Sequence, residues 1–397
     1  MTYQEKPAKN MTQEARLCAK ELCCGCGLCC EVCPAAAVSM RADNEGFLYP
    51  VVDESKCLQC GKCHSLCPAN QTDPERKLIK TFGAFSRDAE IRMSSGSGGI
   101  FGALAADVLE QGGLVCGAAF DGDFNLRHVC VDNKDDLPPL LGSKYLQSDL
   151  SGVYQPLAKA VADGIPVLFA GTPCQVMAMR QYLGDAQNLL SVSIVCQGVA
   201  SPTVFQKYLR EKEEAGGKVV SVDFRSKTLG WMDYSMRIGF ADGRVYSKPF
   251  YQDPYMRLAM NRVFNRPCCD KCFAKCDANP ADIIIGDFWS VQMYIRKYRN
   301  RDRYGFSLVL TSNDKGFEAI KRLKKLKRIS YTKTSLRGMI TYNPAVFTAQ
   351  AHDESRGEFF ASVNDCTVRE LEERLLPEVD YVSALPHTIF DLFRKGK

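Results

Sequence analysis

The pattern of apolar and polar residues changes near residue 80 of the chain. Beyond it, "TFGAFS" (81–86) and "GGLVCGAAFD" (112–121) are short apolar runs typical of buried strands. Between them, "GIFGALAADVLEQGG" (99–113) places apolar residues at helical spacing and ends on glycine. Strands that alternate with helices predict a mixed α/β domain.

Two later apolar runs each lead into a cysteine. "VLFAGTPCQV" (167–176) reads as a strand that enters a Gly-Thr-Pro turn and presents Cys174. "SVSIVCQGVASP" (191–202) presents Cys196 in the same way. Because sites in α/β sheets assemble at the carboxyl ends of strands, we expect both thiols at a functional site.

Before residue 70 the pattern is set by cysteines instead. The chain has 20 cysteines in 397 residues, and "CCGCGLCCEVCP" (23–34) holds six of them. In a cytosolic protein such usage indicates metal or redox chemistry rather than disulfides. The spacing C-x2-C-x2-C-x3-C-P occurs twice, and "CLQCGKCHSLCP" (57–68) is the second copy.

This doubled spacing is typical of two 4Fe–4S clusters, in which the fourth cysteine of each motif binds the other cluster. A zinc ribbon or a thiol store is the alternative. The first cluster is assigned to Cys23, Cys26, Cys29 and Cys67. The second is assigned to Cys57, Cys60, Cys63 and Cys33.

The segment between the motifs predicts a short helix after the proline and a hairpin around Asp43–Gly46. In these features the segment resembles a bacterial two-cluster ferredoxin. Cys18, Cys24 and Cys30 fall outside the spacing and are interpreted as non-ligands.

The composition is that of an ordinary soluble globular protein, with 46% hydrophobic residues and a net charge of +5. The charge is too mild to imply nucleic acid, and the sequence contains no apolar run long enough to cross a membrane. The N-terminus is not a secretory signal, so we expect a cytoplasmic protein. Basic runs at 294–303 and 321–328 are interpreted as solvated helix faces, with an anion-attracting surface as the alternative.

"SSGSGGIF" (94–101) precedes the predicted helix. Small residues at a helix start leave backbone amides open to a phosphate or another backbone. A flexible helix N-terminus is the alternative interpretation, because the order is neither GxGxxG nor a P-loop.

Several motifs together resemble the coenzyme F420 hydrogenase/dehydrogenase beta-subunit family, over about Ser94 to Leu310. They are "LGSKYLQSDL" (141–150), the GTPCQ and C-x-GV-SP turns, "RPCCDKCFAKC" (266–276) and "ADIIIGDFWS" (281–290). The resemblance implies a core domain that binds FAD and one further 4Fe–4S cluster. It also implies a two-electron partner, which is coenzyme F420 in methanogen enzymes and a hydroxymethyl chlorophyll in the related plant enzyme.

The resemblance also implies residue roles. The residues expected at the flavin are Ser95, Gly98, Gly99, Gly142, Ser143, Lys144, Gln147, Thr172 and Pro173. Lys144 would stabilise the anionic reduced ring, and Cys174 would approach the flavin from the strand end. The third cluster would take Cys196, Cys269, Cys272 and, as its fourth ligand, Cys174.

The chain departs from the family pattern in two places. Gln197 stands where members often have a histidine, so that proton donor is missing. The second departure is an expanded cysteine pair, Cys268, Cys269, Cys272 and Cys276. On spacing alone this tetrad could hold zinc or a cluster without Cys174 or Cys196.

We therefore expect an α+β and α/β protein, in which a small ferredoxin-like domain is fused to a mixed α/β flavin-binding core. The expected parts are a leader (1–20), the ferredoxin domain (21–70), a linker (71–81), two parts of the core (82–195 and 196–340) and an extension (341–397). The extension would end in an amphipathic helix near 387–395.

The expected function is that of an iron–sulfur flavoprotein oxidoreductase, because clusters move single electrons whereas FAD exchanges hydride. Its substrate would be F420 or another small organic molecule, and its redox partner a ferredoxin or hydrogenase/dehydrogenase subunits. A non-catalytic electron-transfer subunit docked on such a complex is the alternative. A homo-oligomer is compatible with either reading.

Overall fold

The computed structural model describes residues 17–71, 80–275, 278–291, 303–336, 338 and 343–377. The predicted linker lies mostly outside these residues, as do Cys276, most of the basic run at 294–303 and the final amphipathic helix. Within the described part, no helix has the length and apolar character needed to cross a bilayer.

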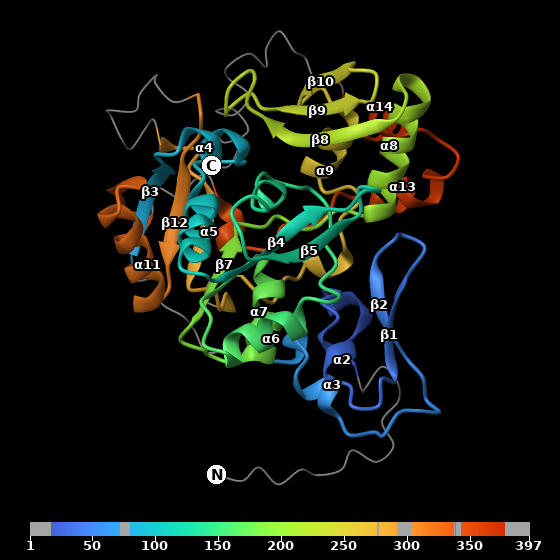
Figure 1. Ribbon diagram of the computed structural model, residues 1–397. Helices are drawn as coiled ribbons and strands as arrows, with labels where there is room; N and C mark the ends of the chain where they lie inside the picture. Colours follow the sequence, from blue (N-terminus) through green and yellow to red (C-terminus); the bar gives the residue numbers. More distant parts are fainter. Residues whose placement is uncertain are drawn as a thin grey trace.

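A mixed eight-stranded sheet forms the centre of the molecule (Figure 1). Its strands, in spatial order, are β13 (Ile329–Lys333), β3 (Lys80–Ser86), β12 (Ser307–Thr311), β11 (Ile283–Asp287), β7 (Leu189–Ile194), β6 (Val167–Gly171), β4 (Leu114–Phe120) and β5 (Leu126–Val131). The four strands β4, β6, β7 and β11 are parallel, and the flanking strands pair antiparallel. The predicted α/β class is therefore confirmed, with strands near both predicted positions.

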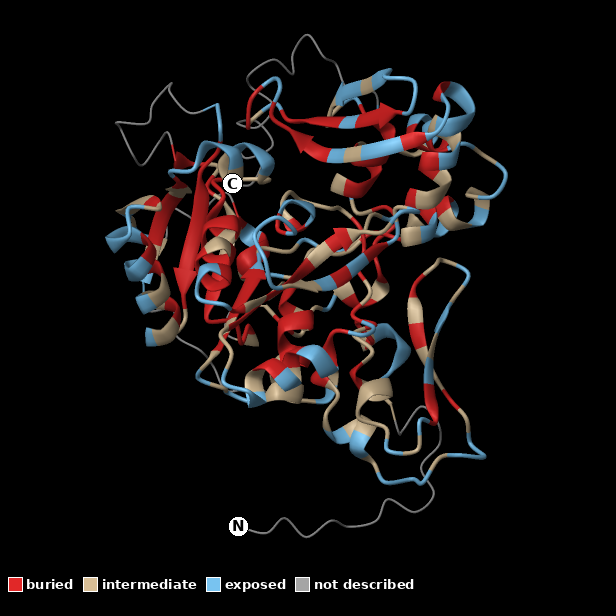
Figure 2. Ribbon diagram, viewed as in Figure 1, coloured by how far each residue is buried: buried red, intermediate tan, exposed pale blue. Residues whose placement is uncertain are grey.

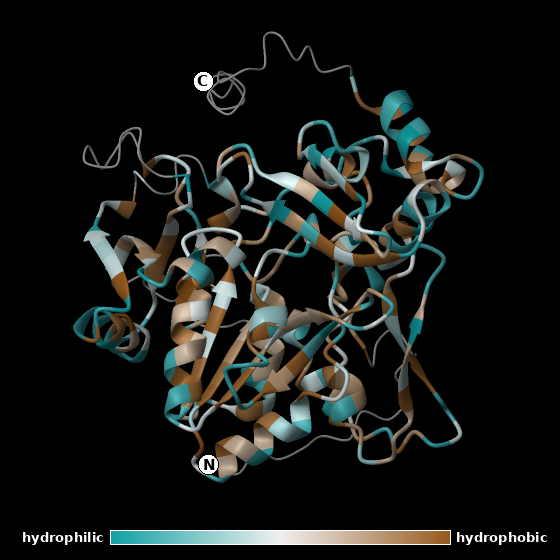
Figure 3. Ribbon diagram, turned by 45° about the horizontal axis from the view of Figure 1, so that its top comes forward, coloured by the Kyte–Doolittle hydropathy of each residue, from teal (hydrophilic) through white to brown (hydrophobic). Residues whose placement is uncertain are grey.

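Alternate residues of the central strands pack on opposite faces of this sheet, as the two-residue period of a strand requires. In β6, Leu168 packs with α5 (Ile100–Glu110) and α11 (Asp314–Lys325). Its neighbours Val167 and Phe169 pack with α6 (Tyr154–Ala162) and α7 (Pro173–Leu183) on the other face. Figures 2 and 3 show the result, a buried apolar sheet between helices whose outer faces are exposed and polar.

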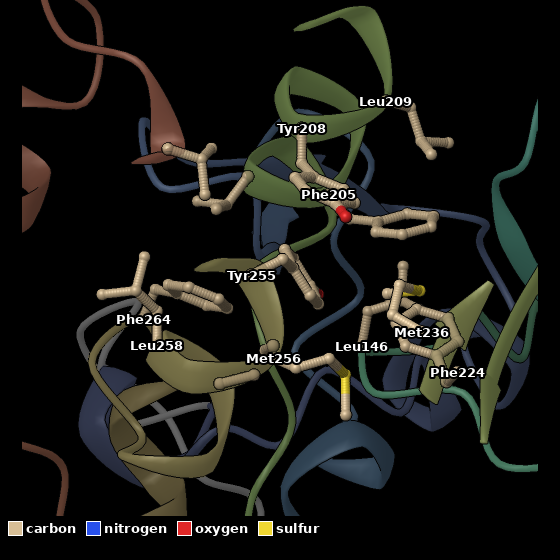
Figure 4. Close-up of a cluster of buried hydrophobic side chains, with 14 of the residues drawn as sticks. Leu146, Phe205, Tyr208, Leu209, Phe224, Met236, Tyr255, Met256, Leu258 and Phe264 are labelled. Carbon is tan, nitrogen blue, oxygen red and sulfur yellow. The ribbon is translucent and has the colours of Figure 1, made fainter. Parts of the chain in front are cut away.

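A smaller antiparallel sheet packs beside the large one. It consists of β10 (Val245–Pro249), β9 (Ser235–Phe240) and β8 (Val219–Ser226). Helices α8 (Pro202–Gly216), α9 (Pro254–Met260), α13 (Arg356–Ser362) and α14 (Val368–Leu375) lie in the same region. Figure 4 shows the aromatic centre of this part, where Tyr255 lies between Phe205 and Phe264.

The N-terminal segment forms a compact cysteine-rich unit against helices α6 and α7 of the core. It contains η1 (Lys20–Leu22), α2 (Leu28–Glu31), the hairpin β1 (Val38–Ala42) and β2 (Leu48–Val52), α3 (Lys62–Ser65) and η2 (Pro68–Asn70). The predicted hairpin turns between Asp43 and Gly46, whereas the predicted helix after Pro34 is replaced by a turn. Leu28 of α2 is 1% exposed and belongs to the same buried cluster as α6 and α7.

Short helices complete the chain and place several site residues. They are α4 (Ala89–Ser94), η3 (Pro138–Leu140), η4 (Pro267–Cys269) and η7 (Pro344–Val346). The basic run at 321–328 lies on the exposed side of α11 and just after it, as a solvated helix face predicts.

Candidate functional site

The four cysteines assigned to the second cluster line one cavity. This cavity measures about 90 Å³ and is bounded by Cys33, Cys57, Cys60 and Cys63 together with apolar neighbours. Cys60 is exposed at the surface of the unit. The spacing therefore brings together a set of four thiols around an open space, as a cubane cluster needs.

The cysteines assigned to the first cluster gather on the inner side of the same unit. The thiols of Cys23, Cys29 and Cys67 interact electrostatically with one another, and Cys26 lies three residues before Cys29, just ahead of α2. The two motifs share a local conformation, because Gly27 and Gly61 precede α2 and α3 with φ of 73° and 72°. Only glycine adopts this left-handed backbone without strain, so the glycine of each C-G-x-C step fixes the turn.

Three cysteines outside the spacing also lie at these sites, and one of them, Cys30, is a hydrogen-bond partner of Cys29. The Cys18 thiol makes side-chain hydrogen bonds to Cys23 and Cys67, which the sequence spacing gave no reason to expect. Cys24 is 8% exposed, and its thiol contacts Cys26 on one side and Cys174 on the other. Cys24 thus connects the N-terminal unit with the core.

A third set of thiols meets in the core. Cys174 lies in the first turn of α7, Cys196 follows β7, and Cys269 and Cys272 come from η4 and the loop after it. Burial, together with Cys269 and Cys174, raises the pKa of Cys196 to about 12. Burial and Cys174 raise the pKa of Cys272 to about 11. Thiols that oppose each other's ionisation in this way suit a cationic centre, which would favour all four thiolates.

The chemistry of these sets, four thiols each, fits a cubane cluster, in which each of four irons takes one thiolate. Among the described residues, no three His, Cys, Asp or Glu side chains lie close enough together to hold one ion. A cubane spreads its four thiolates over four irons, so it suits a wider set. The zinc tetrad remains an alternative, since Cys276 lies outside the described residues.

We expect an iron content of about twelve per chain, because three cubane clusters hold four irons each. Iron and acid-labile sulfide are measured after anaerobic reconstitution, with zinc measured in the same sample. About eight irons with one zinc would support the separate tetrad. Little iron in a folded protein would contradict all three assignments.

A second, larger cavity opens at the carboxyl ends of the parallel strands. Its volume is about 320 Å³, and β4, β11 and the segments after β6 and β7 supply much of its lining. This edge of a parallel sheet is where α/β proteins bind ligands. Cys196 lines the cavity, so the core thiol set borders directly on it.

The residues expected at the flavin divide into two groups. Those that line the cavity are Ser95, Gly99, Gly142, Ser143, Lys144 and Thr172. Gly98, Pro173 and Gln147 are not part of the lining. A Cβ on Gly98 would come within 2.6 Å of the Ala84 carbonyl oxygen, so this glycine allows close packing on the sheet. The Gln147 amide instead donates to the Cys24 carbonyl at 3.0 Å, across the contact with the N-terminal unit.

Lys144 makes hydrogen bonds to the backbone and also lines the cavity. Its Nζ donates to the Pro139 and Leu141 carbonyl oxygens, each at 2.8 Å. An ammonium group has three donors, so one remains for a ligand in the cavity. Burial lowers the pKa of Lys144 to about 7, while Asp223 opposes the shift.

A buried polar network supports the turn that carries Cys174. His128 Nε2 donates to the Ala170 carbonyl at 3.0 Å, so its Nδ1 accepts from the Ser148 hydroxyl. Burial lowers the pKa of His128 to about 4, which keeps the ring neutral. Gln175 donates to Ser148 Oγ and closes a capping box with Thr172. The helix start at Cys174 is therefore fixed by its own sequence and by β5.

Arg225 and Asp287 are cavity residues that sequence reasoning did not single out. Arg225 is 4% exposed, and its Nη1 donates to Asp287 Oδ2 at 2.6 Å. The guanidinium also lies 4.3 Å from the Tyr234 ring centroid and 5.2 Å from that of Trp289. Asp287 and Trp289 lie in the "IGDFW" motif, which was the available signal.

Comparison with known proteins identifies the two parts of this arrangement. Residues 22–71 match the 4Fe-4S dicluster domain, and residues 166–336 match the family described as the C terminus of the beta subunit of coenzyme F420 hydrogenase/dehydrogenase. The dicluster match supports an iron–sulfur protein. In particular, the chain joins a dicluster domain to the C-terminal domain of that beta-subunit family.

One solved structure similar to this chain is the F420-reducing [NiFe] hydrogenase complex from Methanosarcina barkeri, described in a xenon-derivatization study. The match has 21% sequence identity and a TM-score of 0.46, and it covers 66% of this chain and 84% of the other. No curated protein matches the sequence.

Proposed function

We propose that the protein is an FAD-dependent iron–sulfur oxidoreductase, which passes electrons between its dicluster domain and a flavin in the 320 Å³ cavity. The observation that carries this proposal is the position of Cys196. It lines the cavity and also interacts with Cys174 and Cys269 of the core thiol set. The core cluster would thus border on the flavin.

The three thiol sets form a continuous series from the surface to the cavity. The outer set includes exposed Cys60, and the inner set includes Cys23, whose neighbour Cys24 contacts Cys174. Electrons would therefore pass from the outer cluster to the inner cluster and then to the core cluster. The step from the inner set to the core would follow the contact between Cys24 and Cys174.

The cavity lining suits a flat, polar cofactor. The helix start before α5 is built of small residues, and a Cβ on Gly96 would lie 2.2 Å from Ser143 Oγ. The FAD would be held by cavity-lining residues, namely Ser95, Gly99, Ser143 and Lys144. When bound, FAD takes up electrons singly and exchanges them in pairs as hydride with a small organic substrate such as F420.

A docked electron-transfer subunit is the second candidate. Leu58 is 68% exposed beside the outer thiol set, which is unusual for a large apolar side chain next to a redox site. A redox partner protein could bind there, whether it is a ferredoxin or a hydrogenase or dehydrogenase subunit. Both candidates use the same series of clusters and differ in whether the chain alone turns over substrate.

The test is an assay of the isolated chain, reconstituted anaerobically with iron, sulfide and FAD. Reduced viologen supplies electrons, and the absorbance of F420 reports hydride transfer. FAD binding with F420 reduction supports the enzyme. FAD binding without turnover of F420 or related acceptors supports the docked subunit, and failure to bind any flavin contradicts both forms of the proposal.

Replacing both Cys60 and Cys63 with Ser is expected to abolish electron exchange with an external ferredoxin or viologen, while FAD stays bound. The reason is that the outer cluster lies in the dicluster domain, away from the cavity. Flavin reduction is followed by absorbance after mixing with the reduced donor. Cys366→Ser, outside all three thiol sets, is the control. Loss of FAD in the double variant would show that the two parts are not separate modules.

A further inference from the structure

Arg266 is a completely buried arginine at the contact between the dicluster domain and the core. It is 0% exposed. Its Nε donates to the Cys23 carbonyl at 2.7 Å, and its Nη2 donates to the Leu48 carbonyl at 2.8 Å. Its Nη1 donates to Gln147 Oε1 at 2.9 Å. The side chain therefore spans both parts of the protein.

None of these partners carries a negative charge. Among the described residues, no Asp or Glu forms an ion pair with Arg266, whereas buried Arg225 pairs with Asp287 and partly buried Arg180 pairs with Asp282. A buried guanidinium without a counter-charge is unfavourable, because no attraction to an anion offsets the loss of its hydration. The position of Arg266 is thus unfavourable unless an anion lies beside it.

The anions at hand are thiolates. Arg266 Nη2 lies 3.7 Å from Cys23 Sγ, in the geometry of a hydrogen bond to sulfur. Cys23, Cys268 and Cys24 are also the groups nearest to it in electrostatic terms, together with Tyr49. Cys23 is assigned to the inner cluster. The thiolates that bind a cluster are negatively charged, so they would supply the counter-charge of the Arg266 guanidinium.

The surroundings are shaped to admit this side chain. Gly25 lies between Cys24 and Cys26 with φ of 69°, and a Cβ there would come within 2.7 Å of Arg266 Nη1. On its other side the guanidinium lies 4.2 Å from the Tyr49 ring centroid. The N-terminal unit thus leaves room for the Arg266 guanidinium, which comes from the core.

We propose that Arg266 is the counter-charge of the cluster that Cys23 binds, and that its charge and its Nη2–Sγ hydrogen bond raise the reduction potential of that cluster. The inference rests on the proposed function for its ligand set. Reduction adds one negative charge to a cluster, and a fixed cation with a hydrogen bond to sulfur favours the reduced state. Arg266 acts here as a positioning residue, since it touches the ligand rather than the irons.

The experiment compares Arg266→Gln and Arg266→Lys with a matched control, Arg356→Gln. Arg356 also joins the core to the dicluster domain, but it does so through the carboxylate of Glu45. Full-length protein is reconstituted anaerobically, its iron is counted, and each cluster is titrated with redox mediators while its reduced form is followed by EPR. This titration needs neither flavin nor substrate, so its result is independent of hydride transfer.

In Arg266→Gln we expect one cluster to become about tenfold harder to reduce, which for one electron is about 59 mV more negative. Arg266→Lys keeps the charge but loses the fork, and its shift should lie between that of Arg266→Gln and the wild type. The Arg356→Gln control should titrate as the wild type. Equal shifts in Arg266→Gln and Arg356→Gln would reduce Arg266 to a docking contact and overturn the proposal.

Unchanged potentials in Arg266→Gln would overturn it as well. If Arg266→Gln does not fold, Arg266→Met removes the charge with an uncharged side chain of similar length, and unchanged potentials in that variant would overturn the proposal. A wild-type potential in Arg266→Lys would overturn the Nη2–Sγ contribution. A wild-type protein that folds but takes up no iron would contradict the proposed function rather than the role of Arg266.

Discussion

Replacing Cys269 with Ser is expected to lower the iron content from about twelve to about eight per chain and to stop electron flow into the cavity. Cys269 interacts with Cys174, Cys196 and Cys272, so its loss removes one corner of the core thiol set. The two clusters of the dicluster domain should remain, since their thiols come from another part of the chain. The donor would then reduce those clusters and leave bound FAD oxidised.

The matched control for this variant is Cys268→Ser at the adjacent position. Cys268 is 6% exposed and its thiol contacts Cys269, yet it stands outside the assigned set. Iron counting and EPR of both proteins separate the two cysteines. If Cys268→Ser lost four irons and Cys269→Ser lost none, Cys268 rather than Cys269 would be the ligand. That result would favour a ligand set other than the one assigned.

Replacing Lys144 with Met is expected to leave FAD bound but to lower its reduction potential and to slow hydride transfer, on the order of a hundredfold. The ammonium lies at the cavity and would face the negative charge that develops on a reduced flavin ring. Methionine keeps the length of the side chain and removes the charge. The flavin potential and the single-turnover rate are the quantities to measure.

The pH dependence of the same rate is a second measure of this role. The pKa of Lys144 lies near 7 because burial disfavours its charged form. The charged form is the one that stabilises negative charge, so the wild-type rate should fall as the pH rises through about 7, and that of Lys144→Met should not follow. Lys144→Arg, which stays charged throughout, should be rapid at both ends of the range.

Other results would assign Lys144 a different part. Loss of FAD in Lys144→Met would indicate a phosphate contact. Wild-type potential, occupancy and rate together would leave only its two hydrogen bonds to the Pro139 and Leu141 carbonyls. A lower melting temperature alone would then be its whole effect.

The cysteine spacing predicted that the thiols within each motif gather, but it did not predict that Cys18 lies beside Cys23 and Cys67. A ligand loop is local, and the glycines at 27 and 61 permit the left-handed backbone that both loops adopt, so the sequence carries most of the information. The core set could be predicted only from motifs, because Cys174 and Cys269 are 95 positions apart and meet through the sheet. The strands that present Cys174 and Cys196 were readable from their apolar runs.

Side-chain direction was the part that sequence could not provide. Gln147 shares its segment with Lys144, yet the two side chains point to different neighbours, one to Cys24 and one to the cavity. Arg266 looked like an ordinary polar residue before a cysteine pair. Arg266 is buried because two domains dock over it. Such a contact produces no periodic pattern of apolar and polar residues in the sequence of either domain.

Leu28 has a consequence for how the protein handles electrons. Because this residue of α2 is enclosed in the same apolar interior as Tyr154 of α6, the dicluster domain cannot swing away from the rest of the chain without exposing that interior to water. Clusters held by these thiol sets would therefore form a fixed relay rather than a mobile carrier, with a constant spacing between successive clusters. A gene fragment that ends at the domain boundary would expose this shared interior, so the dicluster domain should not be transplantable as an independent ferredoxin.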